Sequence, residues 1–256
     1  MQIHCKKLIY KIYDNIILYL VNITLKMIMI YKDEDIKKMY MCYKDTIFFG
    51  PKFNELLDNE LLLNYKKVIF SDYLLNENFI KEYETYKNKN FQYCSFNTKS
   101  LFNNKVNRLP QHITHLSFGY KFNQPVTKLP QLITHLTFGW NFNQLVNRLP
   151  QFITHLTFGY KFNQSVNLLP KLITHLTIGH EFNQINQINQ INQINQINQI
   201  NQINQTSVFL PSTIKYLKLD CDNYHIIGTL SNNIEELELG QFFNLELNDL
   251  PILLKK

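Results

Sequence analysis

The sequence predicts a mainly β protein built as a parallel solenoid of ~20-residue coils, with a small α-helical cap at its N-terminus. Three observations lead to this prediction. A 20-residue unit recurs four times without a change of phase between residues 109 and 184. Each unit alternates apolar and polar residues briefly and then has Gly, as a short strand before a bend would. Residues 1–90 instead have mixed charge and the apolar spacing of short amphipathic helices.

Composition places the chain among ordered intracellular proteins. Of 256 residues, 45% are apolar and 18% charged, which is enough for a buried core and argues against wholesale disorder. The four cysteines, Cys5, Cys42, Cys94 and Cys221, form no CxxC pair and no dense framework. We therefore expect a reduced intracellular protein, located in the cytoplasm.

No segment of the sequence predicts a membrane span or a secretory signal. The most apolar stretch, residues 8–30, is interrupted by Asp14, Asn15, Asn22 and Lys26. No run in it approaches the roughly 20 apolar residues that cross a bilayer. We expect an ordinary buried helix there, and no membrane partner.

The repeats decide the fold. Four copies follow one another and read LPQHITHLSFGYKFNQPVTK, LPQLITHLTFGWNFNQLVNR, LPQFITHLTFGYKFNQSVNL and LPKLITHLTIGHEFNQ, from Leu109, Leu129, Leu149 and Leu169. The same frame returns more loosely at Leu210, at Leu230 and as LP at Leu250. Upstream, residues 91–110 look like a copy with two extra residues, and FGPKFN at residues 49–54 is a fainter echo.

Each copy has six apolar positions that we expect to be buried. In the first copy they are Leu109, Ile113, Leu116, Phe118, Phe122 and Val126. Burying six side chains does not offset the conformational entropy of ordering twenty residues. A single coil is therefore unstable, and coils must stack in register to share their apolar interior.

The LPxxITHLTFGxxFNQ unit resembles the FNIP repeat, a relative of the leucine-rich repeat found in proteins of amoebae and giant viruses. The resemblance is strong over residues 109–184 and looser over residues 91–251. The unit departs from the family in its shorter period and in Gln124, which stands where the family name has Ile. The resemblance implies a leucine-rich-repeat-like stack of parallel strands that serves as a protein-protein interaction scaffold, without catalytic activity of its own.

Four regions follow from these patterns. Residues 1–90 form the helical N-terminal region, residues 91–184 the FNIP-type repeats, and residues 206–256 degenerate C-terminal repeats. Residues 185–205 are seven copies of INQ, a period that matches neither a strand nor an α-helix. We favour a poorly ordered loop there. A crude extra coil is the alternative, and Asn/Gln ladders also make this segment a candidate for self-association.

A column of histidines is the first candidate site. His115, His135, His155 and His175 each precede an inward Leu, so strand alternation places them on the outer face about 5 Å apart. A straight column offers at most two ligands to one ion, whereas zinc needs converging ligands, so we predict no metal site. We interpret the column as a repeated partner-binding surface, with metal or pH chemistry as the alternative.

A second column follows the Gly of each copy, with Tyr120, Trp140, Tyr160 and His180. Strict alternation would bury these residues, and the bend would expose them. If they are exposed, they lie beside Lys121 and Lys161. Such a surface grips a partner's side chains or stacks bases.

The distribution of charge along the chain helps to decide between a protein partner and nucleic acid. Residues 91–184 carry eight Lys and Arg against one Glu, and residues 185–256 carry four against seven acidic residues. Eight cations over that length make a thin electrostatic footprint for nucleic acid. We therefore predict an acidic protein partner rather than nucleic acid.

A third column, Asn123, Asn143, Asn163 and Asn183, stands beside a core Phe in every copy. We expect these amides to satisfy backbone groups at the bends of neighbouring coils, because buried polar groups need partners. A recognition site is the alternative.

The N-terminal region has a second interpretation that the resemblance supplies. Proteins with such repeats often begin with an F-box, a helical module that binds the Skp-type adaptor of a ubiquitin ligase. Residues 13–20 (YDNIILYL) and 35–44 (DIKKMYMCYK) weakly resemble its two halves, although the spacer is long and the usual LP opening is missing. Ile12, Ile16, Ile17 and Leu20 fit one helical face, and Ile36, Met39 and Tyr43 another.

An enzyme is not predicted. Catalysis brings unlike groups to one point, whereas this chain repeats like groups along a line. The sequence has no GxGxxG, GxxxxGK[ST], GxSxG or HExxH motif. We expect a non-enzymatic scaffold without a cofactor, and a ubiquitin-ligase substrate adaptor is the alternative.

Overall fold

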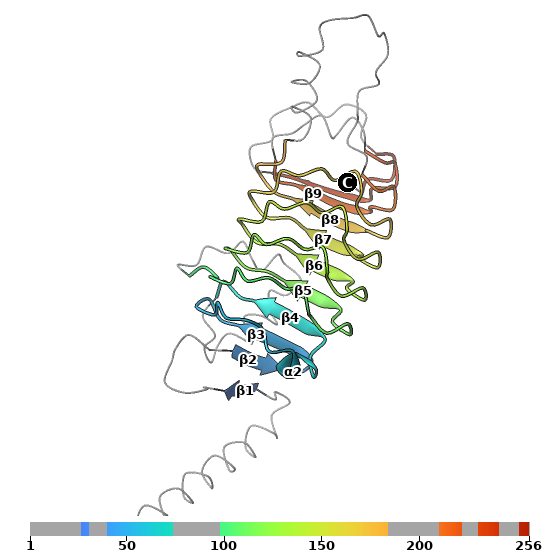
Figure 1. Ribbon diagram of the computed structural model, residues 1–256. Helices are drawn as coiled ribbons and strands as arrows, with labels where there is room; N and C mark the ends of the chain where they lie inside the picture. The colour runs from blue at the N-terminus through green and yellow to red at the C-terminus, as the bar shows by residue number, and fades with distance from the viewer. Residues whose placement is uncertain are drawn as a thin grey trace, which may run out of the picture.

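The protein is a single twisted sheet whose strands are the rungs of a solenoid, seen in a computed structural model (Figure 1). The structure describes residues 40–73, 98–183, 210–221, 230–240 and 251–255, and the backbone of residues 27–30. Within these residues, ten strands lie in one sheet in their order along the chain. β1 (Met27–Ile30), β2 (Tyr40–Tyr43) and β3 (Thr46–Phe49) pair antiparallel, and every later pairing is parallel.

The repeats form the regular part of the stack. β5 (His115–Ser117), β6 (His135–Thr137), β7 (His155–Thr157) and β8 (His175–Ile178) pair so that equivalent residues of successive copies lie opposite each other. β9 (Tyr216–Leu219) and β10 (Glu236–Leu239) continue the sheet in the same register. The solenoid prediction is therefore confirmed, including the degenerate copies that begin at Leu210 and Leu230.

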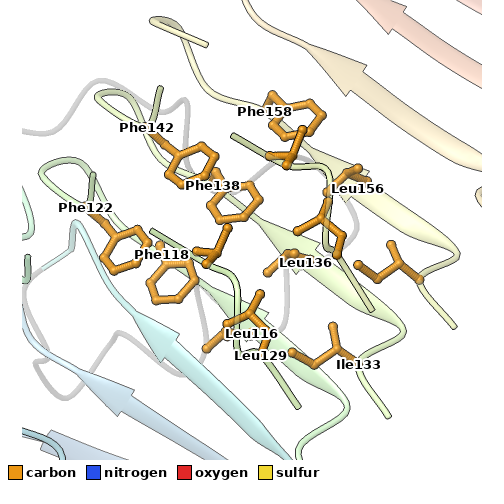
Figure 2. Packing of buried hydrophobic residues seen from close by; sticks show 14 of the residues in the cluster. Leu116, Phe118, Phe122, Leu129, Ile133, Leu136, Phe138, Phe142, Leu156 and Phe158 are labelled. Carbon is orange, nitrogen blue, oxygen red and sulfur yellow. The ribbon is translucent and has the colours of Figure 1, made fainter. Parts of the chain in front are cut away.

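The six apolar positions of each copy form one continuous core, as predicted. In the copy of β6 all six side chains are at most 3% exposed. Within a coil the two Phe rings stack, with the Phe118 and Phe122 centroids 3.7 Å apart, and Phe118 lies 5.8 Å from Phe138 of the next coil. Figure 2 shows these rings and the neighbouring Leu and Ile side chains running from coil to coil. Each coil thus buries its apolar residues against its neighbours.

The glycine after each strand is required by close packing. No Gly has a positive φ among the described residues, so backbone conformation does not demand it. A Cβ at Gly139 would lie 2.1 Å from the carbonyl oxygen of Gly119, and Gly159 and Gly179 stand in the same relation to the coil before them. The column of Gly lets consecutive backbones approach directly.

The predicted helical N-terminal cap is wrong for the described part of residues 1–90. Residues 40–49 form a β-hairpin through β2 and β3, joined by Lys44 and Asp45, and the helix there is the single turn α2 (Asn59–Leu62). Ile36 and Met39 lie outside the described residues, but Tyr43 of the same predicted helical face lies in β2. β2 and β3 are buried on both faces, and a run of apolar residues fits either a strand or a helix period. The predicted helix over residues 12–20 lies outside the described residues.

The hairpin turn carried little sequence signal. Lys44 has a φ of 53°, and it is the one described residue with a positive φ. Two-residue hairpin loops ordinarily place Gly, Asn or Asp at such a position. Lys44 therefore gave no turn prediction.

The coil before the first full copy takes its strand from farther upstream than predicted. β4 (Lys67–Phe70), not residues 91–98, pairs with β5. The backbone N–H of Lys121 bonds to the carbonyl oxygen of Ser100, as that of Asn141 bonds to Tyr120, so Ser100 is the equivalent of Tyr120. The segment 72–99 is therefore an insertion between the strand and the Phe-Asn pair of this coil.

The faint echo at residues 49–54 is a true coil. The backbone N–H of Leu101 bonds to the carbonyl oxygen of Pro51, and that of Asn103 bonds to Asn54 Oδ1. Both bonds repeat the pattern of the full copies.

The INQ segment lies outside the described residues, and within the described residues no helix is long and apolar enough to cross a membrane.

Candidate binding face

The outer face of the sheet repeats two side chains per coil. In β6, Leu136 points into the core, and His135 and Thr137 lie on the opposite, partly exposed face. The register aligns His115, His135, His155 and His175 into one line, hereafter the His column. Their rings stack, with centroids 4.1 Å apart at each of the three steps and interplanar angles of 9° to 11°. The predicted outward column is confirmed.

A threonine before each histidine fixes its ring. Thr134 Oγ1 donates to the carbonyl oxygen of Thr114 at 3.2 Å, and it lies 2.9 Å from His135 Nδ1. The hydroxyl has one proton and the carbonyl can only accept, so Nδ1–H donates to the hydroxyl oxygen. The pattern repeats at His155 and His175. The neutral column therefore presents Nε2 as a row of hydrogen-bond acceptors.

The histidines stay neutral well below neutral pH. Burial, followed by repulsion from His115, Lys67 and His175, lowers the pKa of His135 to about 4. The pKa values of His115 and His155 are also lowered to about 4, first by burial. Burial lowers the pKa of His175 too, while the Glu236 carboxylate acts in the opposite direction. The imidazole rings of this column therefore become protonated only at a lower pH than an ordinary His side chain.

Both ends of the His column lead into charged residues. Lys67 lies opposite His115, and Asp45 is 3.6 Å from Lys67. At the other end Tyr216 stacks 5.7 Å from His175, and Glu236 follows in the same register. The neutral middle of the face is thus bounded by ion pairs at both ends.

The residues after each Gly form a second line, hereafter the aromatic column. Tyr120, Trp140, Tyr160 and His180 are half-buried or exposed, with Trp140 37% exposed, so the bend turns them outward. The Trp140 and Tyr160 rings stack at 4.1 Å and 2°. Lys99 covers the free face of Tyr120, with Nζ 4.2 Å from the ring centroid. Ring edges, not ring faces, are therefore offered to a partner.

This arrangement removes the stacking argument for nucleic acid. A base stacks on an open aromatic face. In the aromatic column the faces of Trp140 and Tyr160 cover each other, and Lys99 lies over Tyr120. Lys121 and Lys161 are exposed, and each lies in the turn at the corner of its coil, directly after the aromatic residue. The predicted site residues therefore form two separate lines. The His column lies at the first residue of each strand, and the aromatic column follows the Gly after each strand.

The Asn column has the structural role that was expected. Asn143 Oδ1 accepts hydrogen bonds from the backbone N–H of Asn163 and from Gln164 Nε2, both at 2.9 Å. Equivalent bonds run from Asn54 through Asn103, Asn123 and Asn163 to Asn183. Gln124, which departs from the family name, repeats this contact with Asn103 Oδ1 at 3.3 Å. These amides join coil to coil.

Sequence reasoning missed one exposed apolar line. Leu132, Phe152 and Leu172 are 51%, 55% and 49% exposed, and they occupy the second x of LPxxITHL in three consecutive copies. The signal was present, because an apolar residue recurs at a position that the buried pattern does not use.

Within the described part of the chain, no group of three or more His, Cys, Asp or Glu is placed to hold a metal ion.

The fold and these columns define a repeat protein whose stacked coils present one set of outward side chains many times over. Residues 122–148 match the model of the family described as FNIP Repeat, which confirms the resemblance to FNIP repeats over these residues. No curated protein matches the chain. A solved structure described as CroV588, a novel circular LRR protein, is 26% identical with a TM-score of 0.48. That match covers 84% of this chain and 34% of the other, so this chain spans about a third of the other's length.

Proposed function

We propose that the chain is a non-enzymatic protein-protein interaction scaffold, whose partner binds across the His column and the aromatic column. The observation that carries the proposal is the shared register of the exposed lines on a core that is almost fully buried. Rigid elements hold the exposed side chains in place, so binding a partner costs little of their conformational entropy. Repeated identical groups also favour an extended contact over chemistry at one point.

Two parts of this surface differ in the partner they suit. The corner with Lys99, Lys121 and Lys161 is basic and suits the acidic protein partner that the charge distribution predicts. The His column is neutral and offers acceptors, so it suits hydrogen-bond donors. A partner that crosses both lines therefore needs acidic groups at the corner and donor groups over the strands.

The full chain, expressed in cells and purified with its partners for mass spectrometry, tests the proposal. The double variant His135→Ser and His155→Ser, and the variant Trp140→Ser, should each lose the main protein partner at least tenfold. Asn147→Ser, an exposed position on another side of the coil, is the matched control. An unchanged set of partners in all variants would overturn the proposed face.

The adaptor function gains no support from the described residues. Of the two segments that resemble an F-box, residues 13–20 lie outside the described part, and residues 40–43 form strand β2 instead of a helix. Recovery of a Skp-type adaptor with the full chain would favour that function over the simple scaffold. A cytoplasmic location is part of the proposal, and microscopy of the tagged full chain tests it.

A further inference from the structure

One line of exposed cations is not used by the proposed face. Arg108, Lys128 and Arg148 occupy the same repeat position in three consecutive coils, hereafter the basic column. Each is exposed in the turn that directly precedes the buried Leu of its LP pair, ahead of β5, β6 and β7. These strands pair in register at about 4.8 Å per step, so the stack keeps the three cations next to one another.

The basic column carries a charge that the described chain does not balance. Like charges at equivalent positions of neighbouring strands are destabilising, and the same Coulomb repulsion acts between neighbouring turns. Residues 98–183 contain eight Lys and Arg against one acidic residue. Among the described residues, no carboxylate forms an ion pair with any member of the column. The stack therefore leaves this row of cations available to an anion from outside.

The coils of β9 and β10 show the opposite arrangement. There a Lys in one coil faces a Glu in the next, in the pairs Lys215–Glu235 and Lys218–Glu238. Stacked charges of opposite sign attract each other, so these coils balance their own charge. The repeat architecture can thus pair cations across coils, and it does not do so at the basic column.

Arginine is concentrated at this one position. Of the 26 Lys and Arg residues in the sequence, only Arg108 and Arg148 are Arg, and both belong to the basic column. A guanidinium group binds a carboxylate or a phosphate through two parallel hydrogen bonds, whereas an ammonium group acts as a point charge. The column therefore suits a row of oxyanions.

Exposed apolar residues at one end of the column favour a protein as the source of these oxyanions. Leu168 is at the position equivalent to Arg148 in the next coil and is 68% exposed, and Leu145, three residues before Arg148, is 63% exposed. They are the two most exposed large apolar side chains in residues 98–183. A nucleic acid backbone has no aliphatic side chain to place on them. Anionic lipid is typically bound by clusters of about four to eight cations, more than this column has.

The spacing of the column selects an α-helix over an extended segment. A helix places one side chain on the same face at each turn of about 5.4 Å, and a strand does so about every 6.7 Å. Against a step of about 4.8 Å, three side chains of a helix drift by about 1 Å, and those of a strand by about 4 Å. Long Arg and Lys side chains accommodate the smaller drift.

We propose that the basic column is a second docking site of the scaffold, which binds an acidic α-helix of a partner protein that lies along the stack. Three carboxylates of the helix, one per turn, bind Arg108, Lys128 and Arg148. An apolar side chain at the next turn packs on Leu168. The site uses other residues than the His column and the aromatic column, so it goes beyond the proposed face and can be tested separately.

Fluorescence anisotropy of a labelled, covalently stapled helical peptide, titrated with the full chain, tests the proposal. One face of the peptide carries three Glu and then a Leu, one residue per turn. The test variant changes the whole basic column, with Arg108→Gln, Lys128→Gln and Arg148→Gln. The matched control removes the same charge at three exposed cations elsewhere, with Lys52→Gln, Lys66→Gln and Lys171→Gln.

The test variant should weaken peptide binding at least about tenfold and reduce its dependence on salt, because the charge-assisted bonds are lost. The matched control should change affinity less than about twofold, because exposed charges away from the site are screened by salt. Every substituted side chain is exposed, so both proteins should keep the fold, and circular dichroism checks this. A further variant, Leu168→Asp, should weaken binding by repelling the peptide.

Several outcomes would overturn the proposal. One is a wild type that does not bind the peptide, and another is an equal loss of affinity in the test variant and the matched control. A loss that occurs instead in the double variant Lys121→Gln and Lys161→Gln would place the helix beside the aromatic column. Tighter binding of a single-stranded oligonucleotide or of anionic lipid vesicles at the basic column would assign the site to another ligand. None of these results affects the partner capture that tests the proposed face, because these variants leave the His column and Trp140 unchanged.

Discussion

The coils of β5–β8 and those of β9–β10 follow the same path but are held together differently. In the first set, close-packed Gly and bonded Asn recur at each step, and the coils of β5, β6 and β7 each bury a stacked Phe pair. In the second, Leu237 and Leu239 are only half-buried, and ion pairs such as Lys218–Glu238 and Lys215–Glu235 link the coils on the outside. Exposed ion pairs contribute little, typically under about 1 kcal/mol each. Stability should therefore be concentrated in the middle coils.

The largest expected difference comes from the core. Phe138 is fully buried between Phe118 and Phe158, with ring centroids 5.8 Å away on each side. Phe138→Ala should lower the free energy of unfolding by about 4 kcal/mol, because it removes a large buried side chain and leaves a cavity. Leu239→Ala, at the half-buried equivalent in β10, should cost about 1 kcal/mol. Urea unfolding followed by circular dichroism measures both, and equal losses would contradict the comparison.

Glycine packing gives the next difference. A Cβ at Gly139 would lie 2.1 Å from the carbonyl oxygen of Gly119, and backbone atoms cannot move aside as a side chain can. Gly139→Ala should therefore destabilise the protein by about 3 kcal/mol. At Gly240 the nearest atoms of Asp220 are 3.2 Å from the added Cβ, so Gly240→Ala should change stability by less than about 1 kcal/mol. If Gly139→Ala lowers the free energy of unfolding by less than about 1 kcal/mol in the same assay, the two coils can move apart at little energetic cost.

The regular coils could be predicted from sequence because one pattern is repeated with its phase intact. The six apolar positions, the outward His and the bonding Asn each follow from strand alternation and from the need to pair buried polar groups. The reason for Gly could not be predicted, since a bend and a close approach require the same residue. In the structure Gly139 lies against Gly119 and has no positive φ, so the close approach is the reason.

The N-terminal coils were beyond sequence reasoning for two physical reasons. β2 and β3 are buried on both faces, so they lack the alternation that identifies a strand. The insertion 72–99 separates β4 from the rest of its coil, and a repeat frame cannot be followed through so long a gap. The exposure of the aromatic column was also undecided, because alternation and the bend at Gly favour opposite sides of the chain.

The Asn column should have a smaller effect than the core. Asn143→Ala removes the oxygen that accepts from the Asn163 N–H and from Gln164 Nε2. Loss of two partly buried hydrogen bonds should lower the free energy of unfolding by about 2 kcal/mol. Asn147→Ala, at an exposed position of the same coil, should cost under about 0.5 kcal/mol. If urea unfolding shows that both variants lower the free energy of unfolding equally little, the hydrogen bonds of the Asn column do not stabilise the contact between coils.

The smallest effect per residue is the pH dependence of the His column. In the folded chain the pKa values of His115, His135 and His155 are lowered to about 4, whereas an unfolded His titrates near 6.5. Between these values the unfolded chain binds protons that the folded chain does not, so stability is complete above pH 6.5 and falls toward pH 4. The rings are partly exposed and screened by water, so we expect a loss of about 1 kcal/mol per His.

The pH effect is best isolated as a difference between two proteins. Nearby charges contribute as well: Lys67 lowers and Asp45 raises the pKa of His115, and Glu236 raises the pKa of His175. Burial also raises the pKa of Asp72 and Asp220, which acts in the opposite direction on stability as pH falls. The triple variant His115→Gln, His135→Gln and His155→Gln keeps these groups, so its unfolding free energy should fall less than that of the wild type between pH 7 and pH 4. If the free energy of unfolding depends on pH in the same way for both proteins, protonation of the stacked rings does not destabilise the fold. The His column would then contribute nothing to the pH dependence of the middle coils.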